Sequence, residues 1–256
     1  MKRLSLIGLG IVDERSVPLK GIDLMTEADR VFCEFFTSIL EEGSLSRLEE
    51  IIDKKIEILD REGIEEKEIV MRSLEDVDHV CLLTAGDPMT ATTHQEIRLD
   101  ALKKGCSIDI VNSGSIFTAA AGVAGLQHYK FGRTTTLAYP EGNYFPTSPL
   151  DMILENRERS LHTLVLLDIQ AHNERYMTAP EGCDIILKMA EKSGTSSIGP
   201  EAMVVGIARA GREDQKILYA SLGDIKEMDL GGPPHCLIIP GKLHFMEEEV
   251  LELFRI

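Results

Sequence analysis

The 256-residue sequence contains no tryptophan and only five tyrosines and eight phenylalanines. Basic residues are also few: 27 Lys and Arg stand against 43 Asp and Glu, which gives a formal net charge of −16. Binding the phosphates of nucleic acid needs a basic face, so this balance argues against a nucleic-acid partner. It suits a cationic ligand or a basic protein partner, although many cytoplasmic proteins are simply acidic.

Long hydrophobic segments and paired cysteines are missing as well. The apolar run at 4–12 is too short for a membrane span and ends at Asp13 and Glu14 without a signal-peptide cleavage site. The five cysteines are scattered, with no Cys-x-x-Cys pair. They predict reduced, mostly buried thiols in a cytoplasmic protein. Apart from the weak match His244-x-x-Glu247, the seven histidines form no zinc motif, so no metal is expected.

Strand-like and helix-like segments alternate in the first half of the chain, which is typical of βαβ units and a mostly parallel sheet. Strands are predicted at 4–8, 30–36, 56–59, 77–83 and 107–111. Helices are predicted from Pro18, from Ser44 to Ile52 with Ser44 as cap, and from Thr93 to Lys104, with Thr93 and Glu96 as a capping box. The break at 112–115 predicts a boundary between domains 1–112 and 113–256.

The second half is less regular. Its predicted strands are 134–138, 163–168, 203–208, 217–221 and 236–239, and its predicted helices are 116–126, 150–160, 181–191 and 245–253. The segment 211–214 lies between two strands and suggests a hairpin, so a mixed sheet is expected here. The predicted fold class is therefore α/β, with two α/β domains, a mostly parallel sheet in the first and a mixed sheet in the second.

The first candidate motif is 7–13, Ile-Gly-Leu-Gly-Ile-Val-Asp, which begins like the dinucleotide fingerprint but has Asp13 in place of the third glycine. Glu34 ends the second strand, where a ribose-binding carboxylate would lie. However, the helix begins late and Asp13 and Glu14 would repel a pyrophosphate. The sulfonium cation of S-adenosylmethionine tolerates an acidic turn better, and a tight turn without any ligand is the third interpretation.

Two further turns follow predicted strands. In 84–88, Asp87 could bind a ribose hydroxyl or a cation, or could merely cap the next helix. In 112–116, the N–H groups at the start of a helix could hold a ligand carboxylate such as the methionine end. Ligands of open α/β sheets bind beyond the carboxyl ends of the strands, so both turns are candidate ligand sites.

The segment 138–149 is rich in proline, and five of the thirteen aromatic residues lie between Tyr129 and Phe145. A loop of this kind is a candidate recognition surface or lid. The alternative is a loop that packs its own aromatic side chains. We expect the segment 139–149 to face the substrate.

Seven stretches occur in an order that is specific as a set. They are IGLGIVDER at 7–15, EFFTS at 34–38, LTAGDPMTATTH at 83–94, LAYPEGNYFPTS at 137–148, HTLVLLDI at 162–169, ARAG at 208–211 and GGPPHCLIIPGKLH at 231–244. Together they resemble the diphthine synthase branch of the tetrapyrrole-methylase-like (class III) methyltransferases. The turn 10–13 departs from the longer Gly-Pro-Gly-Asp-type loop of tetrapyrrole methylases, which favours the diphthine branch.

The resemblance implies a homodimeric methyltransferase that uses S-adenosyl-L-methionine in the cleft between its domains. It implies a protein substrate, translation elongation factor 2, methylated in diphthamide biosynthesis on the amino group of a 3-amino-3-carboxypropyl histidine. Carried over position by position, the implied cofactor contacts are Ile11, Asp87, Thr90, Ser115, Ile116, Leu167, Ala210 and His235. Thr90 stands where the family pattern has an apolar residue, and no general base can be named.

Other functions stay open on the sequence alone. One is methylation of a small-molecule tetrapyrrole. Another is a nucleotide-dependent oxidoreductase built on Gly8, Gly10 and Glu34. The last is a non-catalytic adaptor that binds a translation factor through the aromatic loop.

Overall fold

The structure is a computed structural model that describes residues 1–35, 38–65, 68–140, 142 and 145–256. It separates into two compact units, unit 1 (Met1–Ile116) and unit 2 (Phe117–Ile256). The boundary lies four residues after the one expected from the sequence (112 against 116). Within the described ranges, no helix combines the length and the apolar character that crossing a membrane requires.

Unit 1 is built on a five-stranded sheet in which every neighbouring pair of strands is parallel. The strands are β1 (Arg3–Gly8), β2 (Arg30–Glu34), β3 (Glu57–Leu59), β4 (His79–Thr84) and β5 (Ser107–Val111), in the order β3-β2-β4-β1-β5. Side chains of β1 alternate between two cores: Leu4 and Leu6 face one side, and Ile7 faces the other. Apolar side chains on both faces of a strand require cover on both sides of the sheet.

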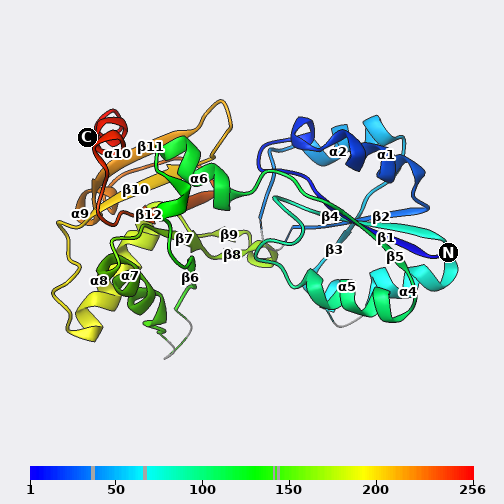
Figure 1. The fold of residues 1–256 in the computed structure, drawn as a ribbon, viewed down its shortest axis with the longest axis horizontal. Helices are drawn as coiled ribbons and strands as arrows, with labels where there is room; N and C mark the ends of the chain where they lie inside the picture. The colour runs from blue at the N-terminus through cyan, green and yellow to red at the C-terminus, as the bar shows by residue number, and fades with distance from the viewer. Residues whose placement is uncertain (36–37, 66–67, 141, 143–144) are drawn as a thin grey trace. The chain divides into compact units, whose positions relative to one another are not determined.

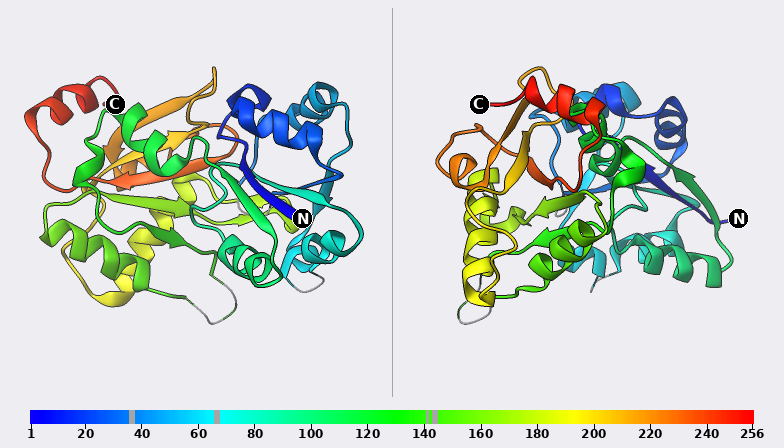
Figure 2. Two further views of the ribbon diagram at one scale, coloured as in Figure 1. Left: turned by 45° about the vertical axis from the view of Figure 1, so that its right-hand side comes forward. Right: turned by 60° about the vertical axis from the view of Figure 1, so that its left-hand side comes forward.

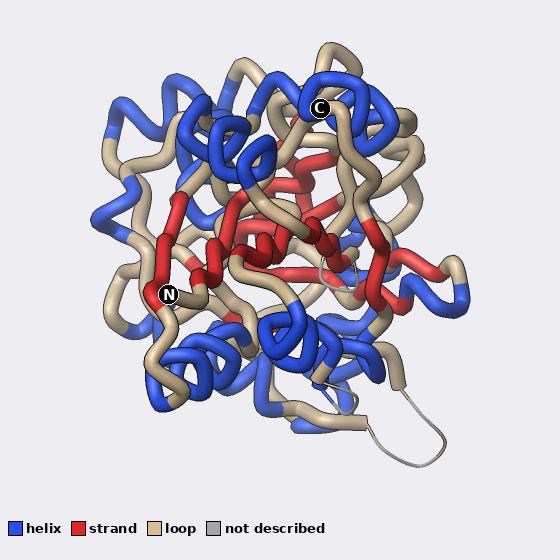
Figure 3. The backbone as a smooth tube through the Cα atoms, turned by 90° about the vertical axis from the view of Figure 1, so that its right-hand side faces the viewer, coloured by secondary structure: helices blue, strands red, loops and turns tan. Residues whose placement is uncertain are grey.

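Helices provide that cover. In Figure 1, α1 (Leu19–Glu27) and α2 (Ser44–Ile52) lie on one face of the unit 1 sheet, and α4 (Ile69–Asp76) and α5 (His94–Lys103) lie on the other. Figure 3 shows the same layering from the end of this unit. A 3-10 turn, η1 (Glu14–Ser16), precedes α1, and the short α3 (Arg61–Glu65) precedes α4. The α/β class and the parallel sheet predicted from the sequence are confirmed.

Several local predictions for unit 1 were wrong. The sequence prediction had no helix between 60 and 76, where the structure has α3 and α4. Ser44 is the first residue of α2 rather than its cap, because Gly43 takes the cap position in the left-handed region. Thr93 is the cap residue of α5, but its side chain makes no capping hydrogen bond, so the predicted capping box does not form. Phe36, the last residue of the second predicted strand, lies outside the described residues.

Unit 2 contains a mixed five-stranded sheet of order β11-β10-β12-β7-β6, visible in Figure 2. Its strands are β6 (Thr135–Leu137), β7 (Thr163–Leu167), β10 (Met203–Ala208), β11 (Lys216–Ser221) and β12 (His235–Ile239). β6 and β7 are parallel, and the remaining neighbours are antiparallel. The predicted hairpin joins β10 to β11, and the short β8 (Ile169–Gln170) and β9 (Arg175–Tyr176) form a separate ribbon.

The helices of unit 2 lie on both sides of this sheet. α7 (Ser148–Glu158) and α8 (Ala179–Ser193) cover one face in Figure 1, and α6 (Ile116–Ala124) and α10 (Phe245–Glu252) cover the other. The remaining helical elements are η2 (His128–Lys130), η3 (Ala171–Asn173) and α9 (Leu222–Ile225). All five cysteines of the chain are free and buried, as predicted.

The weak match His244-x-x-Glu247 is a helix cap. His244 caps α10, and the Glu247 carboxylate accepts from the His244 N–H at 2.8 Å. Glu247 also binds the Lys130 ammonium, and it accepts from the Gln127 N–H at 2.9 Å and from His162 Nε2 at 3.1 Å. Although burial raises the pKa of Glu247, these bonds lower it to about 2. The motif therefore fastens α10 to its own unit.

Candidate functional site

Three sequence motifs meet at one edge of the unit 1 sheet. β1 lies between β4 and β5, with Gly8 opposite Thr84 and Ile7 opposite Val111, so the three strands end side by side. Beyond the strand ends, the Gly10 N–H donates to the Gly86 carbonyl at 3.1 Å, and the Gly86 N–H donates back at 2.6 Å. The connection from β1 leads to β2 on one side of the sheet, whereas the connection from β4 leads across β1 to β5 on the other side. Ligands of open α/β sheets bind at such a switch point.

Two glycines allow this close approach. A Cβ at Gly8 would lie 2.5 Å from the Gly86 carbonyl oxygen and 2.9 Å from the Ser113 Cβ, so a larger residue would push the three turns apart. Gly86 has φ of +82°, which favours glycine, and a Cβ there would meet nothing within 4 Å. Its backbone therefore faces open space, as a close ligand contact requires.

Asp87 joins the turns. One carboxylate oxygen accepts from the Met89 N–H and the Thr90 hydroxyl, each at 3.0 Å. The other accepts from the Asn112 side-chain amide at 2.9 Å and the Ser113 N–H at 3.3 Å. Burial raises the pKa of Asp87, but these four hydrogen bonds outweigh it and keep the pKa below its usual value. Since all four bonds are internal, Asp87 shapes the site more than it offers free oxygens to a ligand.

The predicted acidic character of the first turn is cancelled by arginines. The Asp13 carboxylate accepts from the Arg15 N–H at 3.0 Å and from Arg15 Nε at 2.8 Å. These contacts lower the pKa of Asp13, with the Arg15 side chain as the main cause. Glu14 pairs with Arg47 at 2.9 Å. The expected repulsion between a pyrophosphate and these two acids is therefore weakened, because Arg15 and Arg47 compensate their charges.

Glu34 is the residue on which a dinucleotide site would depend, and it is fully buried. Its Oε1 lies 3.9 Å from Nε2 of His94, which is also buried. A carboxylate with no exposed surface is not placed to bind the hydroxyls of a ribose. This burial removes the main support for an oxidoreductase.

The other predicted contacts in unit 1 also lie near the strand ends. Ile11 is half-buried in the turn after β1, and half-buried Thr90 donates to Asp87. Ser115 and Ile116 follow β5, and Ile116 is the first residue of α6. All five predicted contacts of unit 1 therefore belong to the connections that follow β1, β4 and β5.

The three predicted contacts in unit 2 share one edge of the mixed sheet. Because β12 is antiparallel to both β7 and β10, its first residue lies beside the last residues of those strands. His235 opens β12 and pairs with Ala208, Leu167 ends β7, and Ala210 follows β10. The structure therefore brings Leu167, Ala210 and His235 to one end of the sheet.

The ring of His235 is occupied within unit 2. Its Nδ1 accepts from the Ala179 N–H at 3.0 Å, and its Nε2 donates to the Gly232 carbonyl at 2.8 Å. Burial lowers the pKa of His235, which matches a neutral ring that both accepts and donates. A ligand contact from His235 would have to come from its backbone or its ring carbons.

The turn after β10 is held by Arg209, which the sequence prediction passed over. Arg209 has φ of +53°, and its N–H donates to the Pro234 carbonyl at 2.8 Å. Its guanidinium binds the Gly232 carbonyl and lies 2.5 Å from the Asp214 carboxylate. Arg209 thus connects the loop before β12 to the β10–β11 hairpin.

The described part of the aromatic loop packs inward. Tyr139 is buried, its N–H donates to Asp168 at 3.1 Å, and the Arg175 guanidinium stacks 3.4 Å from its ring centroid. Phe145 packs against the core of unit 2, and Lys192 lies 5.0 Å from its ring. Glu141, Asn143 and Tyr144 lie outside the described residues. These contacts hold Tyr139 and Phe145 against the rest of unit 2, and they do not pack the two aromatic rings against each other.

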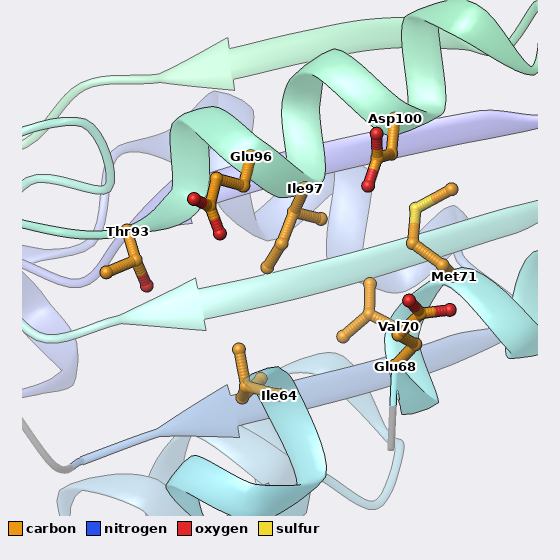
Figure 4. A pocket seen from close by; sticks show the side chains of 8 residues that line it. All are labelled: Ile64, Glu68, Val70, Met71, Thr93, Glu96, Ile97 and Asp100. Carbon is orange, nitrogen blue, oxygen red and sulfur yellow. The ribbon is translucent and has the colours of Figure 1, made fainter. Parts of the chain in front are cut away.

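A separate pocket lies between the helices on one face of unit 1 (Figure 4). Apolar side chains and three carboxylates line it: Ile64, Glu68, Val70, Met71, Thr93, Glu96, Ile97 and Asp100. None of the eight predicted cofactor contacts is among them. The strand-end turns, rather than this pocket, are therefore the candidate site.

Two partners of the site were missed from the sequence. Asn112 supplies the amide that binds Asp87, and His94 binds the carbonyl of Pro88 at 2.8 Å. Asn112 stood inside a recognised motif, but its partner lies 25 positions away. His94 looked only like the start of a helix. Neither hydrogen bond can be recognised from the spacing of apolar and polar residues, which is the signal that a single sequence offers.

Comparison with known proteins decides the family. Residues 3–226 match the model of a protein family described as Tetrapyrrole (Corrin/Porphyrin) Methylases. The chain belongs to this methylase family. A diphthine synthase of Methanococcus aeolicus is 47% identical over 248 residues, covering 96% of each chain. One of Methanothermobacter thermautotrophicus is 44% identical, covering 97% of this chain and 94% of the relative.

Solved structures of similar proteins agree with this membership of the methylase family. A crystal structure of a diphthine synthase superposes with a TM-score of 0.87 at 33% identity, covering 99% of this chain and 96% of that chain. A protein of Entamoeba histolytica, provisionally assigned as diphthine synthase, gives a TM-score of 0.91 at 34% identity, covering 100% and 99%. The resemblance stated from the motifs is confirmed.

Proposed function

We propose that this chain is a diphthine synthase, an enzyme that transfers methyl groups from S-adenosyl-L-methionine in diphthamide biosynthesis. The observation that carries the proposal is the 47% identity to a diphthine synthase over 96% of both chains. The substrate is the 3-amino-3-carboxypropyl histidine of translation elongation factor 2, methylated on its amino group. The enzyme works in the cytoplasm as a homodimer.

The residues at the strand ends fit the proposed cofactor. Gly86 and Gly114 have no atom within 4 Å of an added Cβ, so both expose backbone that a ligand can approach. Arg15 and Arg47 neutralise Asp13 and Glu14, so no uncompensated charge of this turn opposes the ligand carboxylate. When bound, the cofactor supplies a methyl group on a sulfonium. These features support the family's cofactor for this chain.

Eight residues are proposed as cofactor contacts, and they differ in role. Asp87 and His235 act through the turns that they hold, because their hydrogen-bonding atoms already have internal partners. The others offer backbone groups and apolar side chains: Ile11, Thr90, Ser115, Ile116, Leu167 and Ala210. We propose that the start of α6 contributes to binding the carboxylate of the cofactor, because a helix N-terminus favours an anion.

The chemistry needs little from acid–base groups of the chain. An amine attacks a methyl group only in its neutral form, and the ammonium can lose its proton to solvent before binding. Alignment of the two reactants can account for about 7–11 kcal/mol of the barrier at best. The task of this chain is therefore to hold the strand-end turns rigidly and to exclude water. The segment 139–149 is the proposed substrate side.

The decisive experiment is methyl transfer from labelled S-adenosylmethionine to elongation factor 2, with and without the aminocarboxypropyl group on its histidine. Label on the modified factor alone is the expected result, and mass spectrometry then counts the methyl groups. No label on either form, with the cofactor still bound, would direct the search to small-molecule tetrapyrroles. Factor binding that ignores the cofactor would instead favour a non-catalytic adaptor. Fluorescence titration with NADH tests the oxidoreductase, and no binding is expected.

A further inference from the structure

We infer that His94, which is buried and outside every proposed set of cofactor contacts, is a positioning residue that fixes the turn 86–90 through the carbonyl of Pro88. This inference rests on the proposed function, because the turn is proposed to contact the cofactor through Asp87 and Thr90. It concerns a residue that touches neither the cofactor nor the substrate.

The geometry places His94 behind the turn. Its Nδ1 lies 2.8 Å from the Pro88 carbonyl oxygen and 3.4 Å from the hydroxyl of Thr84, the last residue of β4. Only 1% of His94 is exposed, so water does not compete for these contacts. The ring thus connects the start of α5 to the end of β4.

The connection between β4 and α5 needs such a support. Ala91 has φ of +56°, a region that costs a non-glycine residue free energy unless its surroundings hold it. Two donors converge on the Pro88 carbonyl: the Thr92 hydroxyl at 2.8 Å and His94 Nδ1. Because Thr92 and His94 follow Ala91 and Pro88 precedes it, these two bonds close the chain around Ala91. Gly8 packs against the ring of Pro88 from the other side, because a Cβ there would lie 2.9 Å from Pro88 Cδ.

Only one of the two ring nitrogens of His94 makes a hydrogen bond to the turn. A carbonyl oxygen only accepts, so Nδ1 carries the proton and donates to Pro88. In a neutral ring, Nε2 is then an acceptor. It lies 3.9 Å from Glu34 Oε1, beyond hydrogen-bond distance, and has no partner among the residues that the structure describes. Support of the turn therefore resides in Nδ1, and substitutions can separate it from Nε2.

Three substitutions of His94 make that separation. His94→Asn places an amide nitrogen near the position of Nδ1 and can keep the bond to Pro88. His94→Gln reaches toward the position of Nε2 and loses that bond, and His94→Phe keeps the ring volume but removes both nitrogens. We expect Phe and Gln to weaken binding of S-adenosylhomocysteine by roughly tenfold to a hundredfold, the cost of a small misplacement. Asn should stay within about threefold of the wild type.

His79→Phe is the matched control. His79 is also buried, opens the same strand β4 that ends at Thr84, and bonds the Ser5 hydroxyl at 2.9 Å, far from the turn. The control should lower the melting temperature about as much as His94→Phe while leaving the dissociation constant within about twofold, since its lost contacts are structural. In the transfer assay, His94→Gln should raise KM for the cofactor more than it lowers kcat.

The outcomes separate the two proposals. Wild-type protein that binds neither S-adenosylmethionine nor S-adenosylhomocysteine in calorimetry would overturn the proposed function. Wild-type binding with unchanged affinity in His94→Gln would overturn only the role of His94. Loss of affinity in Asn and Gln alike, or in proportion to melting temperature across His79→Phe, would reduce His94 to a core residue. If His94→Phe does not fold, the comparison of Asn with Gln still decides.

Discussion

Each unit holds the turns at one end of its sheet with a buried polar side chain, but the two side chains differ in their hydrogen bonding. In unit 1, an ionised carboxylate, Asp87, gathers hydrogen-bond donors from the turns that follow β4 and β5. In unit 2, a neutral imidazole, His235, accepts a hydrogen bond from the Ala179 N–H and donates one to the Gly232 carbonyl. Both side chains are buried, and both stand at the loop-rich end of their sheet.

The direction of the strands accounts for this difference. In a parallel sheet all strands end at one edge, and the turns that leave it present N–H groups, which an acceptor-only carboxylate can bind together. In the unit 2 sheet, the start of β12 lies between the ends of β10 and β7. Both N–H and carbonyl groups then need partners, and a ring with one donor and one acceptor suits that task.

The largest test of this comparison is Asp87→Ala. It removes four hydrogen bonds and leaves the Asn112 amide and two backbone N–H groups without their acceptor. We expect unfolding free energy to fall by about 4 kcal/mol and cofactor affinity to fall with it. Urea unfolding and calorimetry measure the two effects. Asp87→Asn, which keeps one oxygen, should lose about half as much. Unchanged affinity in Asp87→Ala would remove Asp87 from the site.

Glu247→Gln tests whether a buried carboxylate of unit 2 that lies away from the site stabilises the fold as Asp87 does in unit 1. The pKa of Glu247 lies at about 2 instead of 4.5, so its ionised form stabilises the fold by about 3 kcal/mol. This contribution is complete above about pH 4.5 and is lost as the pH falls toward 2. Urea unfolding at pH 7 should therefore show a loss of about 3 kcal/mol in the variant, and a smaller difference at pH 3.

Glu252→Gln is the matched control for that prediction. Glu252 lies on the same helix and pairs with Arg255, but its side chain is 54% exposed. An exposed pair contributes little, so stability at pH 7 should stay within about 0.5 kcal/mol of the wild type. Equal losses in the two variants would mean that the buried network around Glu247 has no special role.

Two glycine substitutions compare how tightly the units pack. A Cβ at Gly8 would meet the Gly86 carbonyl oxygen at 2.5 Å, whereas one at Gly206 would meet the Leu230 side chain at 3.1 Å. Backbone cannot move aside as a side-chain end can, so Gly8→Ala should cost about 2 kcal/mol and Gly206→Ala about 1. Gly114→Ala, with nothing within 4 Å, is the control. Chemical denaturation ranks the three, and an equal cost at Gly8 and Gly114 would contradict the close packing of the turns.

The smallest effect concerns pH and His235. Burial lowers the pKa of His235 below 6.5, so the unfolded chain takes up a proton before the folded chain does. Stability is then full above about pH 6.5 and is lost as the pH falls through the folded pKa. Between pH 7 and 5, the wild type should therefore lose more stability than His235→Asn. Unfolding followed at several pH values measures this slope, and identical slopes would exclude a neutral His235.

Much of the fold could be predicted because its signals are local. Apolar runs in β1 and β4 and the turns after them marked a parallel sheet, and the turn before β11 marked a hairpin. Failures came where local signals mislead: α3 and α4 follow β3 without a recognised cap, and Thr93 has the spacing of a capping box without the bond. The motifs were found, but their partners were not.

The sequence by itself determined the class of fold, the order of the motifs and, through that order, the methylase family. Tertiary structure alone decided which groups meet. It paired Glu14 with Arg47, buried Glu34 beside His94, and bound Asp87 to Asn112. The physical reason is that periodicity reports the face on which a side chain lies. Contacts between turns depend on the order of strands in the sheet, which one sequence does not display.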